Sequence, residues 1–62
     1  MSYTEVKKEY VIETIAKGSQ VICCDFSTMR MADCAEMTVN TIMAFINKAE
    51  TKFFKAVAND QT

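Results

Sequence analysis

The chain has 62 residues, enough for one small domain over residues 1–62 and too few for a second domain. Half of its residues are hydrophobic and it contains one glycine and no proline, a composition that excludes a disordered segment. Its formal net charge of -1 argues against a general binder of polyanions.

A domain of this length buries only about 60% of the surface that its unfolded chain exposes. Small domains commonly add disulfides, metals or oligomerisation to a thin core. The three cysteines are an odd number, and the charged N-terminal segment lacks the apolar run of a signal peptide, so we expect a cytoplasmic protein with reduced thiols. No stretch approaches the roughly 18 apolar residues of a membrane span. Association is the remaining source of stability.

The N-terminal segment carries a helix-start pattern. Ser2 and Glu5 stand in the positions of a capping box, which predicts a helix over residues 3–17. Gly18 then supplies a left-handed stop, and Lys17 suits the C-terminal end of the helix dipole. Apolar side chains occupy most of the circumference of this predicted helix, more than one packing neighbour requires.

Residues 21–36 admit two interpretations. "VICCDF" is β-branched and aromatic and has the length of a strand, and a turn over "STMR" would make residues 21–36 a hairpin whose paired residue numbers sum to 57. In that hairpin Cys23 faces Cys34, and Ile22, Cys24 and Met31 share an apolar face. However, the turn lacks the glycine or asparagine of favoured hairpin turns. Methionine and alanine favour the alternative, a helix from Met29 onwards.

The C-terminal part shows a period of 3.6 residues. One stripe of residues 39–58 is apolar and contains Val39, Ile42, Ile46, Ala49, Phe53 and Val57. With Thr38 as N-cap, this pattern predicts an amphipathic helix over residues 39–58. The predicted fold class is therefore α+β, a helix–β-hairpin–helix, with an all-α arrangement of two or three helices as the alternative.

The residues that could carry chemistry do not form a recognisable site. Cys23, Cys24 and Cys34 miss the ligand spacing of structural zinc sites, so we interpret them as small hydrophobic residues. The absence of histidine excludes the usual nucleophile–base pairs, and a single glycine excludes a glycine-rich phosphate loop. So short a chain offers little cleft in which the pKa of a carboxylate could shift. We expect no enzyme, no metal and no cofactor.

The apolar surplus predicts a binding surface. The candidate partner-binding residues are Tyr10, Met43, Phe45, Phe53 and Phe54. We expect a non-catalytic interaction protein, a homodimer or other small oligomer that binds and regulates or inhibits a larger protein. Free-standing chains of this size that start at their own Met1 include phage and mobile-element anti-defence inhibitors.

The alternative function is nucleic-acid or anion binding. Lys48, Lys52 and Lys55 are spaced i, i+4 and i+7 on the predicted C-terminal helix. Such a row can follow phosphates even on an acidic protein. This alternative predicts a small dimer that binds nucleic acid through its lysine face.

Overall fold

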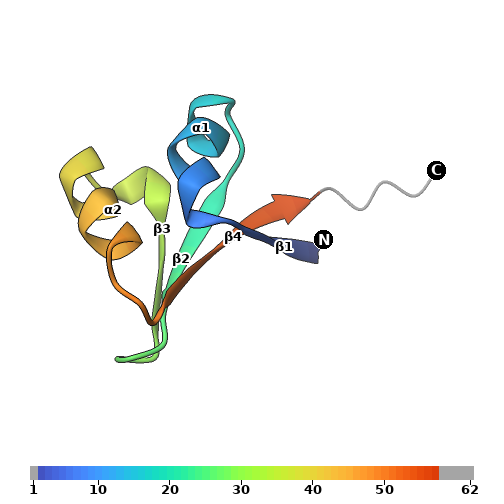
Figure 1. Ribbon diagram of the computed structural model, residues 1–62. Helices are drawn as coiled ribbons and strands as arrows, with labels where there is room; N and C mark the ends of the chain where they lie inside the picture. Colours follow the sequence, from blue (N-terminus) through green and yellow to red (C-terminus); the bar gives the residue numbers. More distant parts are fainter. Residues whose placement is uncertain (1, 58–62) are drawn as a thin grey trace.

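A four-stranded antiparallel sheet organises residues 2–57, the part of the chain that the computed structural model describes (Figure 1). The strand order across the sheet is β1-β4-β2-β3. In chain order the elements are β1 (Ser2–Val6), a 3-10 turn (Lys8–Tyr10), α1 (Val11–Ala16), β2 (Val21–Asp25), β3 (Arg30–Asp33), a second 3-10 turn (Cys34–Glu36), α2 (Val39–Ile46) and β4 (Thr51–Val57).

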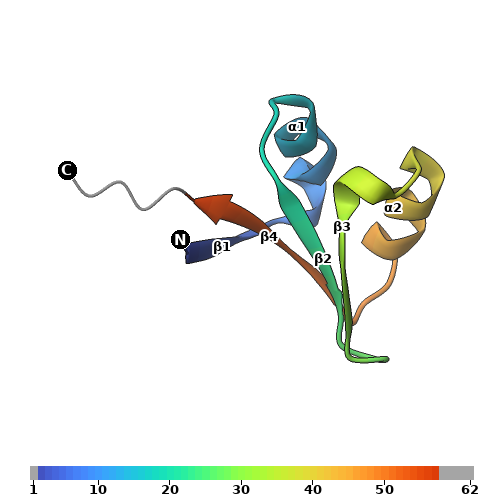
Figure 2. The same ribbon diagram turned by 180° about the vertical axis from the view of Figure 1, so that it is seen from behind.

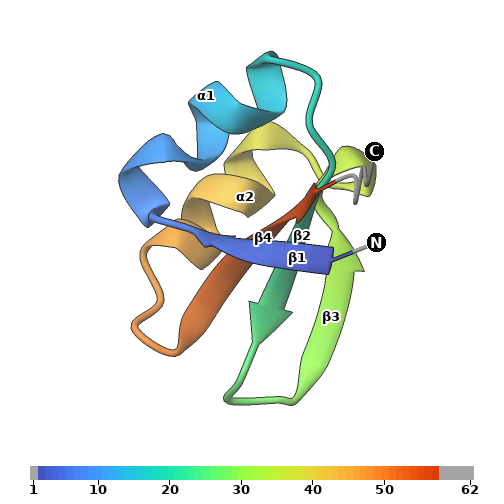
Figure 3. The ribbon, with the colours of Figure 1, turned by 90° about the vertical axis from the view of Figure 1, so that its right-hand side faces the viewer.

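The chain builds this sheet from two interlocked halves. Strands β1 and β2 both pair antiparallel with β4 and so run parallel to each other, with α1 connecting them. Strands β3 and β4 are likewise separated by β2 and connected by α2. Each half is a split β-α-β unit into which the other half inserts one strand. Both helices lie on one side of the sheet, as Figure 2 shows from behind and Figure 3 from the side.

The predicted fold class is wrong in both of its forms. The helix–β-hairpin–helix arrangement requires helices at both ends, and the all-α alternative requires no sheet. Instead the two end segments are strands that pair with each other, with Glu5 opposite Phe54 and Ser2 opposite Val57. A pairing between residues about fifty positions apart is invisible to a local pattern.

The predicted helix over residues 3–17 is wrong over its first half. Tyr3, Thr4 and Val6 favour strands, and pairing with β4 overrides the capping-box pattern at Ser2. Gly18 does end α1 as predicted, with a φ of 93°. The amide of Gly18 donates to Ile15 O at 2.9 Å and that of Ser19 to Thr14 O at 3.3 Å, which is the Schellman pattern.

The predicted helix over residues 39–58 begins correctly and ends too late. Thr38 is the N-cap of α2, and its hydroxyl accepts a hydrogen bond from the amide of Thr41 at 3.2 Å. However, α2 ends at Ile46, and Thr51–Val57 forms β4. Threonine, phenylalanine and valine favour strands, and β4 pairs on both sides. Ala58, where the predicted helix ends, lies outside the described residues.

The hairpin of β2 and β3 is confirmed, and the helix from Met29 is wrong. Its register differs by two residues from the predicted one, because paired numbers sum to 55 and Cys23 therefore faces Ala32. A shift of two keeps every side chain on its predicted face. The connecting loop lies one residue earlier than predicted, over residues 26–29 instead of 27–30. In it Asp25 accepts hydrogen bonds from the amide and the hydroxyl of Ser27, and Met29 adopts a φ of 57°.

The core lies between the sheet and the helices. Its fully buried apolar side chains are Val11, Val21, Cys23, Cys34, Ile42 and Phe53. Half-buried side chains surround them, namely Val6, Ile15, Met37, Phe45 and Ile46. The core is therefore small and one-sided. Among residues 2–57, no helix has the length and apolar character to cross a membrane.

Candidate functional site

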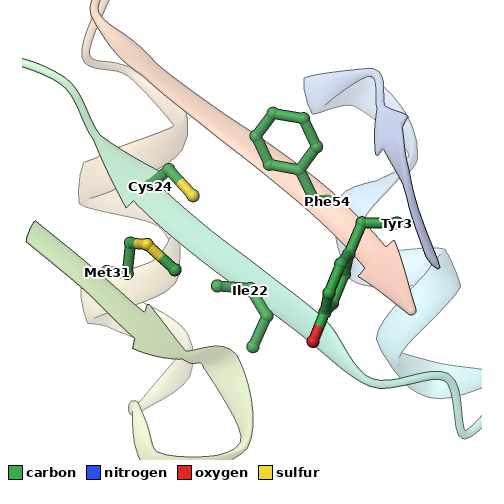
Figure 4. A pocket seen from close by; sticks show the side chains of 5 residues that line it. All are labelled: Tyr3, Ile22, Cys24, Met31 and Phe54. Carbon is green, nitrogen blue, oxygen red and sulfur yellow. The ribbon is translucent and has the colours of Figure 1, made fainter. Parts of the chain in front are cut away.

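The sheet face turned away from the helices is apolar and uncovered. Strand side chains alternate between faces, so the neighbours of the core residues point outwards. Five of these outward side chains form what we call the open face: Tyr3, Ile22, Cys24, Met31 and Phe54. Figure 4 shows them gathered on the side of the strands opposite the helices. They come from all four strands.

Strand register arranges the open face in two rows. The first row crosses all four strands and consists of Glu5, Phe54, Ile22 and Asp33. The second row consists of Lys52, Cys24 and Met31. The apolar side chains therefore occupy the middle of the sheet, and charged side chains lie around them.

The open face is hollowed. Its five residues line a depression of about 280 Å³ that reaches from one edge strand to the other. Tyr3 and Met31 stand on the two edge strands with 55% and 72% of their surface exposed, whereas Ile22, Cys24 and Phe54 are half-buried. Phe26 and Met29 at the hairpin tip line an adjoining depression that shares Cys24 and Met31. The apolar surface thus continues onto the tip.

Three charged side chains border this surface. Asp33 accepts hydrogen bonds from the amide of Ala35 and from the Gln20 side chain, both at 2.9 Å. These bonds, the first above all, lower the pKa of the Asp33 carboxyl. Within residues 2–57, Glu5 and Lys52 take part in no ion pair. The open face therefore offers one acidic and one basic group that are free for a partner.

The predicted partner-binding residues separate into different places. Phe54 lies on the open face. Phe53 is fully buried in the core, so it has no surface to offer a partner and that prediction is corrected. Phe45 is half-buried against the core, while Tyr10 and Met43 are exposed on the helix layer. A helix over residues 39–58 would have grouped several of them, but the strand puts neighbours on opposite faces.

Four of the open-face residues were missing from the predicted surface. The apolar face of the hairpin, with Ile22, Cys24 and Met31, was a usable signal for three of them. Such an apolar face usually lies against a core, yet the helices cover the mixed face with Val21, Cys23 and Asp25 instead. Nothing local marked Tyr3, because its place depends on pairing with β4.

The three predicted lysines do not form a row. Lys48 lies in the connection after α2, where its Nζ is 3.6 Å from a carboxylate oxygen of Asp25 and 5.0 Å from the centre of the Phe45 ring. Lys52 is on the open face. Lys55 is on the helix side, opposite Thr4 and Val21. The helical geometry behind the nucleic-acid alternative is therefore absent.

The three thiols are free and are held in the protonated form. Burial raises the pKa of all three, and it raises that of Cys34 to about 11. Thiols are reactive and ligate metals as thiolates, so these cysteines are poor nucleophiles at neutral pH. Across residues 2–57, histidine, cysteine and acidic side chains form no group of three suited to a metal ion.

Asp25 forms the other polar cluster. It is buried at 6% exposure, and the Ser27 hydroxyl, which donates to it at 2.7 Å, is the main cause of its lowered carboxyl pKa. Lys48 balances its charge. The Thr51 hydroxyl, opposite Asp25 in the register, is buried with no hydrogen-bond partner in the described part of the chain. The cluster contains a single carboxylate, already paired, and its evident role is to close the hairpin.

Comparison with known proteins gives no relative: no family model, no curated protein and no solved structure matches this chain. The function must therefore be argued from the surface itself.

Proposed function

We propose that this chain is a non-catalytic protein-interaction module that binds through its open face. The observation that carries the proposal is a continuous apolar surface across all four strands, which no other part of residues 2–57 covers. Exposed apolar side chains scattered singly are ordinary on proteins, but contiguous ones mark interaction sites.

The composition of the open face supports a protein as the ligand. Aromatic residues and methionine are enriched in protein interfaces, and Tyr3, Met31 and Phe54 supply them here. Burying such surface is favourable by about 25 cal/mol per Å² of apolar area. Charged groups remain at the border, as they do around other protein interfaces.

The chemistry available in the hollow supports a binding role over a catalytic one. Its polar groups are the Tyr3 hydroxyl and the Cys24 thiol, and burial raises the pKa of that thiol. A general base needs a pKa near the working pH, and a nucleophilic thiol needs a lowered one. Regulation or inhibition of a larger protein stays a prediction. We do not extend the nucleic-acid alternative, because its lysines share no face.

Site-specific photo-crosslinking tests the proposal, and the two tyrosines of the chain make a matched pair. Tyr3 is on the open face and Tyr10 is on the helix side, at 55% and 50% exposure. Each is replaced in turn by p-benzoylphenylalanine in the full chain, which is then irradiated both purified and in the cells that produce it.

We expect position 3 to give covalent adducts with protein, either another copy or a different chain, and position 10 to give few. Adducts from neither position would contradict the proposal. Equal yields from both positions would also contradict it, since the open face would then be no more than ordinary surface.

A further inference from the structure

We infer that the occupant of the open face is a second copy of this chain. In the resulting two-fold dimer two sheets stack on their open faces, with the helices outside. This inference rests on the proposed function and names the partner of the same surface.

The first argument is the size of the core. Six apolar side chains are fully buried, all on the helix side of the sheet. The cysteines are free, and residues 2–57 offer no metal cluster, so neither kind of cross-link supplements this core. Domains of this length commonly use such a supplement or association. A second copy is present wherever the chain is made, which suits a partner needed for stability.

The second argument is that the open face fits itself. A two-fold interface uses the same patch on both copies, so the patch must contain both projections and the hollow that receives them. Tyr3 and Met31 project from the edge strands beside the hollow, at 55% and 72% exposure. The same patch therefore contains both exposed projecting side chains and a depression of about 280 Å³.

The third argument is the distribution of charge. A face of one sign repels its own copy, whereas this face carries the acidic Glu5 and Asp33 in its first row and the basic Lys52 in its second. Asp33 accepts hydrogen bonds from Ala35 and Gln20, and Glu5 and Lys52 are in no ion pair within residues 2–57. A two-fold axis that runs across the strands between the rows stacks the first row of each copy on the second row of the other. Glu5 on β1 then lies about one strand spacing of 4.8 Å to the side of the partner copy's Lys52 on β4, within reach of two long side chains, and this approach occurs twice.

The fourth argument is area. Four strands of 4 to 7 residues, spaced by about 4.8 Å and rising about 3.4 Å per residue, give a footprint of about 340 Å² per copy, or about 700 Å² for two. A specific interface needs about 1,000 Å² in total. The strands alone therefore fall about 300 Å² short, and the dimer requires the projecting side chains and the adjoining hairpin tip, with Phe26 and Met29, to supply the remaining area. Face-to-face stacking of two sheets is also a common way of building a core.

Sedimentation of the full chain over a range of concentrations tests the inference. We expect the wild-type chain to sediment at twice its 7.0 kDa mass at micromolar concentration. Tyr3→Glu combined with Met31→Glu places two charges in the interface, and we expect the dissociation constant to rise by about 100-fold or more. Both residues are largely exposed in the single subunit, so its fold should survive, as circular dichroism would report.

The matched control changes the helix layer. Val39→Glu combined with Met43→Glu introduces the same charges at residues that are 63% and 48% exposed on α2. This variant should remain a dimer. A wild-type monomer at every concentration, or a Tyr3→Glu/Met31→Glu variant that is still dimeric, overturns the inference.

A charge exchange decides the matter if the first variant fails to fold. Glu5→Lys or Lys52→Glu alone should weaken the dimer by about tenfold, and the two together should restore it. Failure of the combined variant to restore association overturns the proposed stacking.

These results are separable from those of the crosslinking. If the wild-type chain is a monomer while position 3 still crosslinks to another protein, the second copy is excluded and the interaction function stands. If position 3 gives no adduct at all, both proposals are contradicted.

Discussion

The two faces of the sheet differ less in composition than in what covers them. The adjacent cysteines and the adjacent phenylalanines illustrate this. Cys23 and Phe53 are buried beneath the helices, whereas their neighbours Cys24 and Phe54 point to the open face. The covered face even contains the buried polar side chains of Asp25 and Thr51. The apolar character of a strand face therefore does not by itself show that this face lies in the core. The helix layer decides which face is core and leaves the other uncovered within residues 2–57.

The largest expected effect separates the two phenylalanines. Phe53→Ala removes a fully buried ring and should cost about 3–5 kcal/mol, close to the whole stability of a small domain. Phe54→Ala should leave a folded chain and act mainly by weakening association. Urea unfolding and sedimentation at several concentrations measure the two effects. The comparison of the faces fails if Phe54→Ala unfolds the chain while Phe53→Ala does not.

Thiol labelling should distinguish the cysteines by face. In the Tyr3→Glu/Met31→Glu variant, which we expect to be a monomer, Cys24 should react with a maleimide first, because it lines the uncovered open face. Cys23 and Cys34 should react only when the chain opens, about 100-fold more slowly. All rates should rise with pH, since burial raises the pKa of each thiol and the thiolate is the reacting form. Equal labelling of Cys23 and Cys24 in the folded variant would argue against the assignment of faces.

A substitution in the helix layer should lower the free energy of unfolding without changing the dissociation constant of the dimer. Thr38→Ala removes the hydroxyl that caps α2 and should lower the free energy of unfolding by about 1 kcal/mol. Thr38→Ser keeps the cap and serves as the control. Since Thr38 is on the helix layer, the dimer dissociation constant should stay the same in both variants. A marked loss of dimer in Thr38→Ala alone would indicate that the helices, and not the open face, form the interface.

The smallest expected effect is on the loss of folding stability at acidic pH. The Ser27 hydroxyl lowers the pKa of Asp25 in the folded chain, so the stability from this carboxylate is present above its unfolded pKa of about 3.9 and is lost as the pH falls through the folded pKa. Ser27→Ala removes the main cause of the shift and should make the loss of stability on acidification shallower. Unfolding in urea at neutral pH and near about pH 3 measures this. Ser2→Ala, on the edge strand β1, should behave as wild type, and an unchanged slope in Ser27→Ala would refute the assignment.

The features that could be predicted from the sequence are those made by local chemistry. Gly18 ends α1 and Thr38 caps α2 because each acts on amides or carbonyls a few residues away. The strand over residues 21–25 and the faces of the hairpin followed from β-branched residues and alternation. The error of two in register came from the loop, where Met29 takes a left-handed conformation without being glycine.

The features that could not be predicted depend on pairing between the ends of the chain. Residues 2–6 and 51–57 carry helix-like patterns, a capping box and an apolar stripe. Residues 51–57 are nevertheless a strand because they pair with both β1 and β2, and residues 2–6 are a strand because they pair with β4. The candidate site could not be predicted for the same reason, since Tyr3 and Phe54 come together only through the pairing of β1 with β4. The apolar face of the hairpin could be predicted from the sequence, but its exposure could not, because it depends on where α1 and α2 pack.

An isotope-filtered nuclear Overhauser experiment tests the central claim most directly. Labelled and unlabelled chains are mixed, and only contacts between different copies are observed. In a dimer stacked on its open faces, we expect contacts from the methyl groups of Ile22 and Met31 in one copy to the aromatic rings of the open face in the other. Contacts confined to α1 and α2, or none between copies at millimolar concentration, would contradict it.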